Sequence, residues 1–341
     1  MTPALVGVVT TIQPPTASVR ALAARLSEAG AETLVVGDEK GPFGYDVPGT
    51  RLLTLAQQRE LPFELARLLP TRHYARKNLG YLEAIARGAA CIYETDDDNH
   101  PLAHWRPRTL RAPASRVEVA GWYNAYAPFT GELIWPRGLP LDRIRARAGA
   151  LTAPSETESP IQQGLADGAP DVDAIWRLVL DRDVRFAPGP SLELRPGTWC
   201  PFNSQSTWWW PAAYRLLYLP SHCSFRMTDI WRSFVAQRCL WELGHGVVFH
   251  AAEVEQLRNE HDLVRDFEQE VPGYCGNARI ADLLAKLPLD AGPERVGDNL
   301  LRCWEALVEA GFVAETELAL VRAWGADLDR LLGTPGRRAD R

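Results

Sequence analysis

The sequence predicts an α/β fold built around a parallel sheet, and three observations lead to this prediction. Residues 4–11 form an apolar run rich in β-branched residues, which is typical of a buried parallel strand. Further short apolar runs follow, in alternation with segments of helical periodicity. The apolar runs also end in polar residues, as strands do where they meet a ligand. Alternation of strand and helix favours a parallel sheet with right-handed crossovers.

The first hundred residues supply the predicted core of this sheet. A helix is expected from Thr16, a candidate N-cap, to Gly30, a favourable residue after a helix end. Its apolar positions Val19, Leu22 and Leu26 lie on one face. The other elements expected here are strands at 33–38, 51–55 and 90–95 and a helix at 72–87.

The rest of the chain divides into an irregular part and a helical part. Residues 112–201 are rich in Pro and Gly and predict short strands and loops that complete the same domain. A helix is expected from about residue 228 to Gly244, followed by a strand at 246–249. We therefore expect one ligand-binding α/β domain at 1–255 and a helical C-terminal appendage at 256–341.

The first strand–helix turn contains neither G-x-G-x-x-G nor G-x-x-x-x-G-K-[ST]. A ligand would therefore be held by other residues at the carboxyl ends of the strands, where open α/β sheets bind ligands. The predicted strand ends carry polar or small residues, namely Thr10, Thr11, Gly37, Asp38 and the run Asp96–Asn99. Asp38 has two readings, as a turn residue after Gly37 and as an acceptor for a nucleobase or ribose hydroxyl.

Three consecutive carboxylates, Asp96, Asp97 and Asp98, follow the fourth predicted strand. Charges about 5 Å apart repel each other by about 3 kcal/mol per pair at an effective dielectric near 20, which favours a bound cation. The alternative is a solvated acidic turn that caps the next helix. Carboxylate oxygens suit Mn²⁺ or Mg²⁺, and Asp96 and Asp98 are the expected ligands. Asp97 would point the other way and contact the sugar, as a catalytic residue beside Asp229.

Basic residues precede the same strand at Arg76, Lys77 and Asn78. A basic cluster on a helix is usually a solvated face. If a diphosphate lies at the neighbouring strand ends, the cluster would bind it instead, because guanidinium groups bind phosphate bidentately.

Later in the chain, aromatic and acidic residues indicate an acceptor side. Trp208 and Trp209 are either core residues or a surface on which a sugar stacks, and Arg226 lies close by in the sequence. Asp229 either caps a helix or serves as general base for an incoming hydroxyl.

Two histidines complete the set of candidate residues. His250 follows a predicted strand and is the better candidate for a late metal ligand, while His261 is the other.

Composition excludes several classes of protein. A net charge of −6 argues against a nucleic-acid binder. The start of the chain has no secretory signal, and no apolar run is long enough to span a membrane. The six cysteines form no C-x-x-C pair, so we expect a soluble, cytoplasmic protein with reduced thiols.

Six segments together resemble one family. They are TIQPPT, VVGD, HYARKNLGYLEAIARGA, YETDDDN, PFNSQSTWW and DIWRSFVAQRCLWELG. They resemble the STELLO family of glycosyltransferase-like proteins and, more distantly, the reversibly glycosylated polypeptides, which include UDP-arabinopyranose mutase. Pro170-Asp171-Val172-Asp173-Ala174 is similar to a segment of the mutase group, whereas Asn99 stands where that group has Cys.

The resemblance implies a GT-A-type, Rossmann-like nucleotide-diphospho-sugar transferase fold. It implies Mn²⁺ or Mg²⁺ at Asp96 and Asp98, a nucleotide near Thr10, Asp38 and Arg76, and an acceptor-side acid near Asp229.

Our first hypothesis is a metal-dependent glycosyltransferase that uses a UDP- or GDP-sugar and a carbohydrate or other hydroxyl acceptor. A sugar-nucleotide mutase and a non-catalytic GT-A-like scaffold are the alternatives, and a homo-oligomer stays open.

Overall fold

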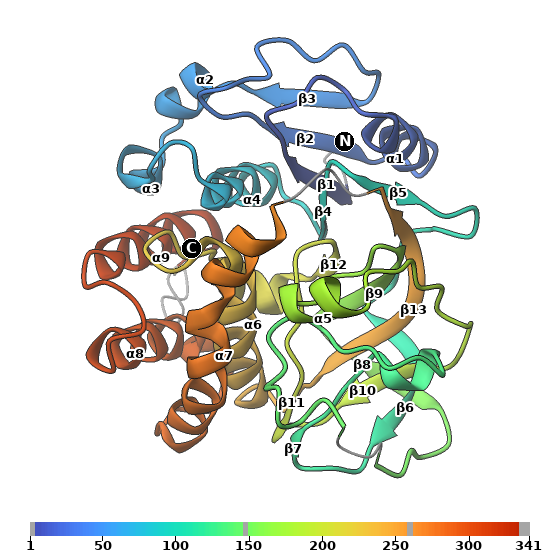
Figure 1. Cartoon of the computed structure of the whole chain (residues 1–341). Coiled ribbons are helices and arrows are strands. Elements are labelled where there is room, and N and C mark those ends of the chain that lie inside the picture. Colours follow the sequence, from blue (N-terminus) through green and yellow to red (C-terminus); the bar gives the residue numbers. More distant parts are fainter. Residues whose placement is uncertain (1–3, 146–148, 258–261, 334–341) are drawn as a thin grey trace.

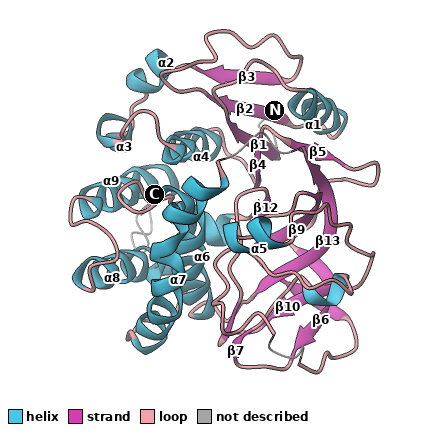
Figure 2. Cartoon of the chain, viewed as in Figure 1, coloured by secondary structure: helices cyan, strands magenta, loops and turns pink. Residues whose placement is uncertain are grey.

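The computed structural model describes residues 4–145, 149–257 and 262–333 (Figure 1). Within these residues, eleven strands form one large sheet in the order β3-β2-β1-β4-β12-β9-β13-β10-β6-β8, with β5 paired to β13. Most of the helices lie along one side of the molecule, beside the sheet (Figure 2). The predicted α/β class is confirmed.

The first four strands are parallel, as the sequence predicts. They are β1 (Leu5–Thr10), β2 (Glu32–Val36), β3 (Thr50–Leu53) and β4 (Cys91–Asp96). Helix α1 (Ala17–Glu28) begins after Thr16, whose hydroxyl accepts from the Val19 amide at 3.1 Å. β2 and β3 lie on one side of β1 in the sheet, and β4 pairs with β1 on its other side. The order of the strands therefore reverses between β1 and β4, which is where such sheets bind ligands.

Helix α4 (Lys77–Ala86) lies against this part of the sheet and follows the short helix η1 (Tyr74–Arg76). Its Gly80 packs so closely that an added Cβ would lie 2.7 Å from both Val8 Cγ1 and Val36 Cγ2. The start of α4 lies beside the carboxyl end of β4, where Lys77 Nζ donates to Asp96 at 2.9 Å.

The second half of the sheet is mixed, and its pairing was not predicted. β12 (Ser206–Trp209) is antiparallel to both β4 and β9 (Ile161–Gly168), and β13 (Val247–Gln256) is parallel to β9. The strand predicted at 246–249 is thus longer, because it continues beside β9 as far as Gln256. The other strands are β5 (Asn99–Pro101), β6 (Arg111–Val117), β8 (Ser155–Glu158) and β10 (Ser191–Leu194), with β7 (Gly121–Trp122) and β11 (Thr198–Trp199) in a separate pair.

The remaining helices cover the sheet or form the C-terminal part. They are α2 (Leu55–Glu60), α3 (Glu64–Leu68), η2 (Ala127–Phe129), α5 (Ala174–Val179), η3 (Pro211–Leu217), η4 (Phe225–Met227), α6 (Thr228–Trp241), α7 (Leu263–Lys286), η5 (Pro293–Arg295), α8 (Val296–Glu309) and α9 (Glu317–Leu332). The carboxylate of Asp327 in α9 accepts from the amides of Glu64 and Leu65, so α9 caps α3. Trp304 and Trp324 share one apolar core with the sheet. No helix of the described residues has the length and apolar character needed to cross a bilayer.

Helix α6 is joined to the sheet by a buried ion pair. Arg232 donates to both oxygens of Glu94 on β4, at 2.7 and 2.6 Å, and Tyr81 donates to the same carboxylate at 2.7 Å. Burial alone would lower the pKa of Arg232, but the charge of Glu94 outweighs it and raises that pKa. Asp229 lies three residues before Arg232, on the same face of α6. The pair therefore directs Asp229 toward the end of β4.

Candidate functional site

A cleft of about 540 Å³ opens at the carboxyl ends of β1, β2 and β4. One wall carries strand-end residues and the other carries residues of η4, α6 and the loops near them. The residues that line the cleft are Thr10, Thr11, Ile12, Gln13, Asp38, Lys40, Arg72, His73, Tyr74, Asp96, Asp97, Asp98, Arg137, Asp171, Gln205, Phe225, Arg226, Asp229 and Gln256. The strand ends that the sequence singled out therefore meet in one place.

The strand ends are brought together by register. Thr10 is paired with Asp96 on one side and with Val36 on the other. Asp38 follows β2 and accepts from the backbone amides of Glu39 at 2.7 Å and His73 at 2.9 Å. It is thus a turn residue and a cleft residue at once.

Each carboxylate of the acidic run has a different partner. Asp96 Oδ1 accepts from Lys77 Nζ at 2.9 Å and from the Tyr74 hydroxyl at 2.8 Å. The Thr11 hydroxyl donates to Asp97 Oδ2. Asp98 Oδ2 accepts from Gln256 Nε2 at 3.1 Å. β4 ends at Asp96, so the strand alternation that would turn Asp97 away from the cleft is lost, and all three side chains line it.

Lys77 supplies a cation for the acidic run. Its side chain is fully buried and its ammonium group lies 2.6 Å from the Tyr74 hydroxyl as well as beside Asp96. The repulsion among the three carboxylates is thus relieved in part by the protein itself.

Two influences act in opposite directions on the pKa of Asp97. Burial raises this pKa and the hydrogen bond from Thr11 lowers it, and burial is the larger influence, so the pKa is raised overall.

The two outer carboxylates fit a divalent cation that is bound together with a ligand. In the described residues, no three His, Cys, Asp or Glu side chains are grouped so that they would hold a metal ion. Asp96 and Asp98 nevertheless face the same cleft. Mg²⁺ is commonly held by one or two carboxylates, with water and substrate phosphates as its other ligands. Two carboxylates at the edge of an open cleft match that mode of binding.

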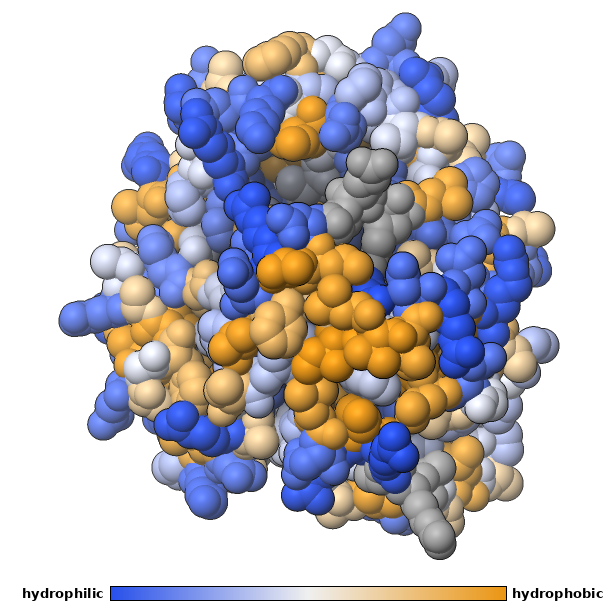
Figure 3. All heavy atoms as spheres, viewed as in Figure 1, coloured by the Kyte–Doolittle hydropathy of each residue, from blue (hydrophilic) through white to orange (hydrophobic). Residues whose placement is uncertain are grey.

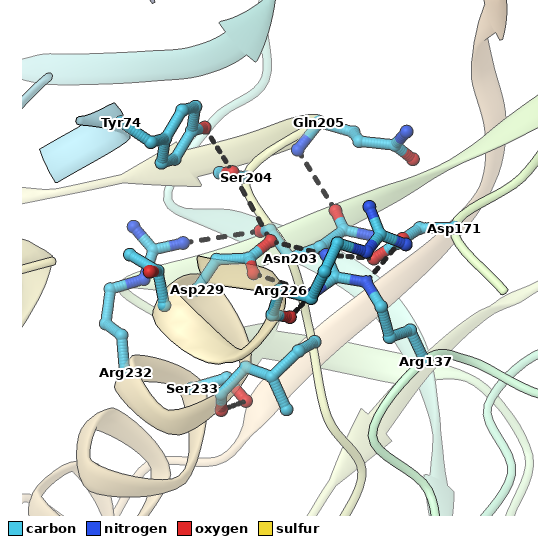
Figure 4. A network of polar contacts seen from close by, with 12 residues as sticks. Tyr74, Arg137, Asp171, Asn203, Ser204, Gln205, Arg226, Asp229, Arg232 and Ser233 are labelled. Atoms are coloured by element: carbon cyan, nitrogen blue, oxygen red, sulfur yellow. Dashed lines mark hydrogen bonds and ion pairs between the residues drawn. The ribbon is translucent and has the colours of Figure 1, made fainter. Parts of the chain in front are cut away.

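The opposite wall is organised by one buried arginine (Figure 4). Arg137 donates to both oxygens of Asp229, at 3.0 and 2.9 Å, and to both oxygens of Asp171, at 2.8 and 2.9 Å. It also donates to the Arg226 carbonyl. Burial would lower the pKa of Arg137, but the two carboxylates outweigh burial and raise it well above the usual value, so the group stays charged.

A chain of hydroxyl groups joins the two walls. The Tyr74 hydroxyl lies against Ser204 Oγ, and Ser204 Oγ donates to Asp229 Oδ2 at 3.5 Å (Figure 4). Since Tyr74 also donates to Asp96, the acidic run and Asp229 are linked through two side chains. Burial, followed by the charge of Asp96, raises the pKa of Tyr74 well above its usual value, so this hydroxyl stays protonated.

Asp229 does not cap α6. The helix begins at Thr228 after Met227, and no side chain caps it. Asp229 instead lies in the first turn with its carboxylate held by Arg137. The prediction that Asp229 caps the helix was wrong, because its carboxylate forms an ion pair with the buried guanidinium of Arg137 instead.

Seven predicted site residues do not line the cleft, namely Gly37, Arg76, Lys77, Asn78, Trp208, Trp209 and His250. Arg76 is buried and donates to Gln58 Oε1 and to the Leu69 carbonyl, which ties the chain before η1 to α2. Asn78 is buried, and its amide group bonds both backbone groups of Leu219. The prediction that these two residues bind phosphate is therefore wrong, because their side chains are occupied by contacts away from the cleft. Lys77 is the member of the cluster that contacts the acidic run.

His250 is buried between Ser191 and Gln162, which it contacts at 2.7 and 2.9 Å. Burial lowers its pKa well below the usual value. The metal-ligand role expected for it does not hold, because both ring nitrogens have partners away from the cleft. The other histidine considered, His261, lies outside the described residues.

The two tryptophans belong to the core. Trp208 donates to Glu253 at 2.7 Å and packs on Tyr93 and Trp105, and Trp209 is fully buried. The prediction that these rings stack on an acceptor sugar is wrong, because neither ring reaches the cleft.

Arg226 does line the cleft, and its guanidinium is held by Glu270 at 2.9 Å. Gly37 precedes the cleft residue Asp38 but does not itself line the cleft, and its amide donates to the Leu53 carbonyl.

Several residues of the site were not singled out as such by the sequence, and they include Tyr74, Arg137, Ser204 and Gln256. Tyr74 and Ser204 lie within motifs that carry the family resemblance, HYARKNLGY and PFNSQSTWW, so a signal was present. Arg137 lies in the Pro- and Gly-rich region, where nothing in the local sequence distinguishes it. Asp171 lies in the Pro-Asp-Val-Asp segment that is similar to the mutase group.

Comparison with known proteins agrees with the motif resemblance. The sequence model of the STELLO glycosyltransferases matches residues 226–334. Two relatives from Arabidopsis thaliana, named "Probable glycosyltransferase STELLO2" and "Probable glycosyltransferase STELLO1", are each 27% identical over 321 residues. The matches cover 88% of this chain and 41% of each relative, so the chain spans less than half of their length. The predicted resemblance to the STELLO family is confirmed.

A solved structure is more distantly similar. It is the crystal structure of M. tuberculosis glucosyl-3-phosphoglycerate synthase, with 12% sequence identity and a TM-score of 0.37, over 81% of this chain and 80% of that chain.

Proposed function

We propose that this STELLO-like chain is a metal-dependent glycosyltransferase of GT-A type that takes a UDP- or GDP-sugar as donor. One observation carries the proposal: a single cleft brings together the strand-end carboxylates Asp96 and Asp98 and the buried Arg137–Asp229 pair. The first group has the chemistry for a cation and a diphosphate, and the second has the chemistry for a hydroxyl acceptor.

On the donor side, Asp96 and Asp98 would hold Mn²⁺ or Mg²⁺. Such a cation stabilises negative charge on a leaving diphosphate. Thr10, Thr11 and Asp38 lie at the end where a nucleoside would bind, and Lys40 provides positive charge at the same wall. Arg72 also lines this wall, with its guanidinium paired with Glu39 at 2.8 Å. Lys77 would keep Asp96 oriented through its contact at 2.9 Å.

On the acceptor side, Asp229 would take the proton of the acceptor hydroxyl. Among the described residues, its Oδ1 accepts one hydrogen bond, from Arg137, and a carboxylate oxygen has room for a second. The acceptor oxygen would then form the new bond to the anomeric carbon, while the bond from that carbon to the diphosphate breaks. Arg137 and Asp171 would hold the carboxylate in place for this transfer.

Titration calorimetry with UDP and GDP, with and without Mn²⁺, tests the proposal. We expect one nucleotide to bind only when Mn²⁺ is present. Asp96→Asn combined with Asp98→Asn should abolish that metal-linked binding and leave the fold intact. The matched control is Asp142→Asn combined with Asp298→Asn, two exposed carboxylates on other parts of the surface, with side chains 70% and 64% accessible.

The results separate the alternatives. Unchanged binding in the Asp96/Asp98 variant would refute the metal assignment. No metal-dependent binding of either nucleotide would favour the non-catalytic scaffold. Interconversion of UDP-arabinopyranose without any acceptor would select the mutase.

A further inference from the structure

The entrance of the cleft borders an exposed apolar surface (Figure 3). We call it the apolar patch; it is formed by α5, η4 and the first half of α7. Its members are Leu178, Val179, Phe225, Val264, Phe267 and Val271. Val179 is 73% exposed and Val264 is 62% exposed, values that are high for side chains of this kind. A contiguous apolar surface of this sort usually marks a binding site.

In the first half of helix α7, charged side chains face the protein interior and apolar side chains face outward, which is the reverse of the usual arrangement. Its inward side chains Asp266 and Glu270 are buried, while Val264, Phe267 and Val271 lie on the exposed face. In a surface helix that serves only the fold, the apolar stripe faces the core. The arrangement is therefore not explained by packing within the chain.

The patch rests on a buried ionic layer that joins its elements. Arg177 of α5 lies 3.0 Å from Asp266, and Arg226 of η4 lies 2.9 Å from Glu270. Glu270 also accepts from the Ala174 amide at 2.7 Å, so it ties α7 to the start of α5. These contacts hold the three elements together and present the patch as a formed surface.

Phe225 makes the patch continuous with the cleft. It is 49% exposed, it lines the cleft, and its ring packs edge-on against His73 at 5.6 Å between centroids. Arg226, the next residue, also lines the cleft. A large partner seated on the patch would cover the cleft entrance, whereas an extension of a molecule already bound in the cleft would lie on the patch without obstructing it.

We infer that the patch binds the apolar portion of the acceptor, so that the acceptor is an amphipathic molecule with a hydroxyl-bearing head and an alkyl or similar chain. This inference rests on the proposed function: the head would lie near Asp229 and the chain would pass Phe225 onto α5 and α7. Chain burial provides binding energy that the small polar head alone lacks.

Alkyl glucosides of increasing chain length test the inference. Methyl, butyl, hexyl and octyl β-D-glucosides, each below its micelle concentration, are titrated into the full chain in the presence of UDP and Mn²⁺. Complete burial of a methylene strengthens binding about fourfold, so we expect about twofold for each methylene on an open surface. Octyl glucoside, with seven more methylenes than methyl glucoside, should therefore bind about a hundredfold more tightly.

Val179→Ser combined with Val264→Ser should remove most of this chain-length dependence. Both side chains are largely exposed, so the fold should be kept, and circular dichroism checks this. The matched control is Leu68→Ser combined with Leu332→Ser, two side chains 45% and 44% exposed on α3 and α9. The control should retain the wild-type dependence.

Each outcome decides the inference. Chain-length dependence that is lost in the Val179/Val264 variant and kept in the control supports it. Equal binding of all four glucosides to the wild type overturns it. A self-association in sedimentation velocity that only the Val179/Val264 variant abolishes would also overturn it, in favour of a second copy. Binding of UDP with Mn²⁺, measured in the same samples, shows separately whether the proposed function stands.

Discussion

Replacing Arg137 by Met should destabilise the protein more than the loss of any surface ion pair. Arg137 is the shared partner of Asp171 and Asp229, and the side chains of all three are at most 10% exposed. Methionine has a similar length but no hydrogen-bond donors. The change therefore leaves two buried carboxylates without the group that holds them.

The magnitude follows from the four hydrogen bonds that Arg137 makes to these carboxylates, at 2.8 to 3.0 Å. Breaking a buried ion pair by removing one partner costs about 3–5 kcal/mol. We expect a loss in this range in the free energy of unfolding, which is a large share of the about 5–15 kcal/mol typical of a domain. Arg111→Met is the control, because Arg111 forms an exposed pair with Glu158, worth about 1 kcal/mol or less.

Urea denaturation measures both variants. Arg137→Met combined with Asp229→Asn should recover part of the stability, since only one unpaired charge remains. A loss below about 1 kcal/mol, equal to that of Arg111→Met, would refute the reasoning that this cluster is buried and coupled.

Three further changes test other parts of the structure. Tyr74→Phe removes the hydroxyl between Lys77, Asp96 and Ser204 and should lower the free energy of unfolding by about 1–2 kcal/mol in urea titrations; an unchanged midpoint would show that the contacts of this hydroxyl do not stabilise the fold. Burial raises the pKa of Asp173 to about 6, so the folded state keeps a proton that the unfolded chain loses near pH 4. The free energy of unfolding should therefore fall by up to about 3 kcal/mol as pH rises from about 4 to about 6, and Asp173→Asn should remove that dependence. The same pH profile in the wild type and the variant would show that Asp173 is not the group responsible. His250→Gln should leave metal-linked nucleotide binding unchanged, and a weaker Mn²⁺ dependence in calorimetry would restore His250 as a ligand.

The first half of the sheet was predictable because its signals are local. A buried parallel strand, a capped helix and a polar strand end are each encoded within about ten residues. Parallel strands place their carboxyl ends at the same edge, so the convergence of Thr10, Asp38 and Asp96 followed from the order of elements alone. The same logic did not reach the second half, where β12 and β9 pair across long stretches of chain.

The errors at the site have one physical origin. Arg76 and Lys77 are neighbours, but they leave the chain at the junction of η1 and α4 in different directions. Arg76 therefore satisfies backbone carbonyls of its own loop, while Lys77 reaches Asp96. Trp208 lies in the core because β12 is paired on both edges, with β4 and β9, and the Tyr93 ring packs on the Trp208 side chain. Direction and burial of this kind depend on what packs around a residue.

By itself, the sequence determined the α/β class, the acidic strand end, the family resemblance and the edge of the sheet at which a ligand would bind. Only the tertiary structure decided which side chains serve that edge. Arg137 lies 92 residues from Asp229 in the chain, and Tyr74 lies 130 residues from Ser204. Hydrogen bonds over such separations form only after the sheet has assembled, because they depend on the packing of segments whose local sequences carry no signal of one another.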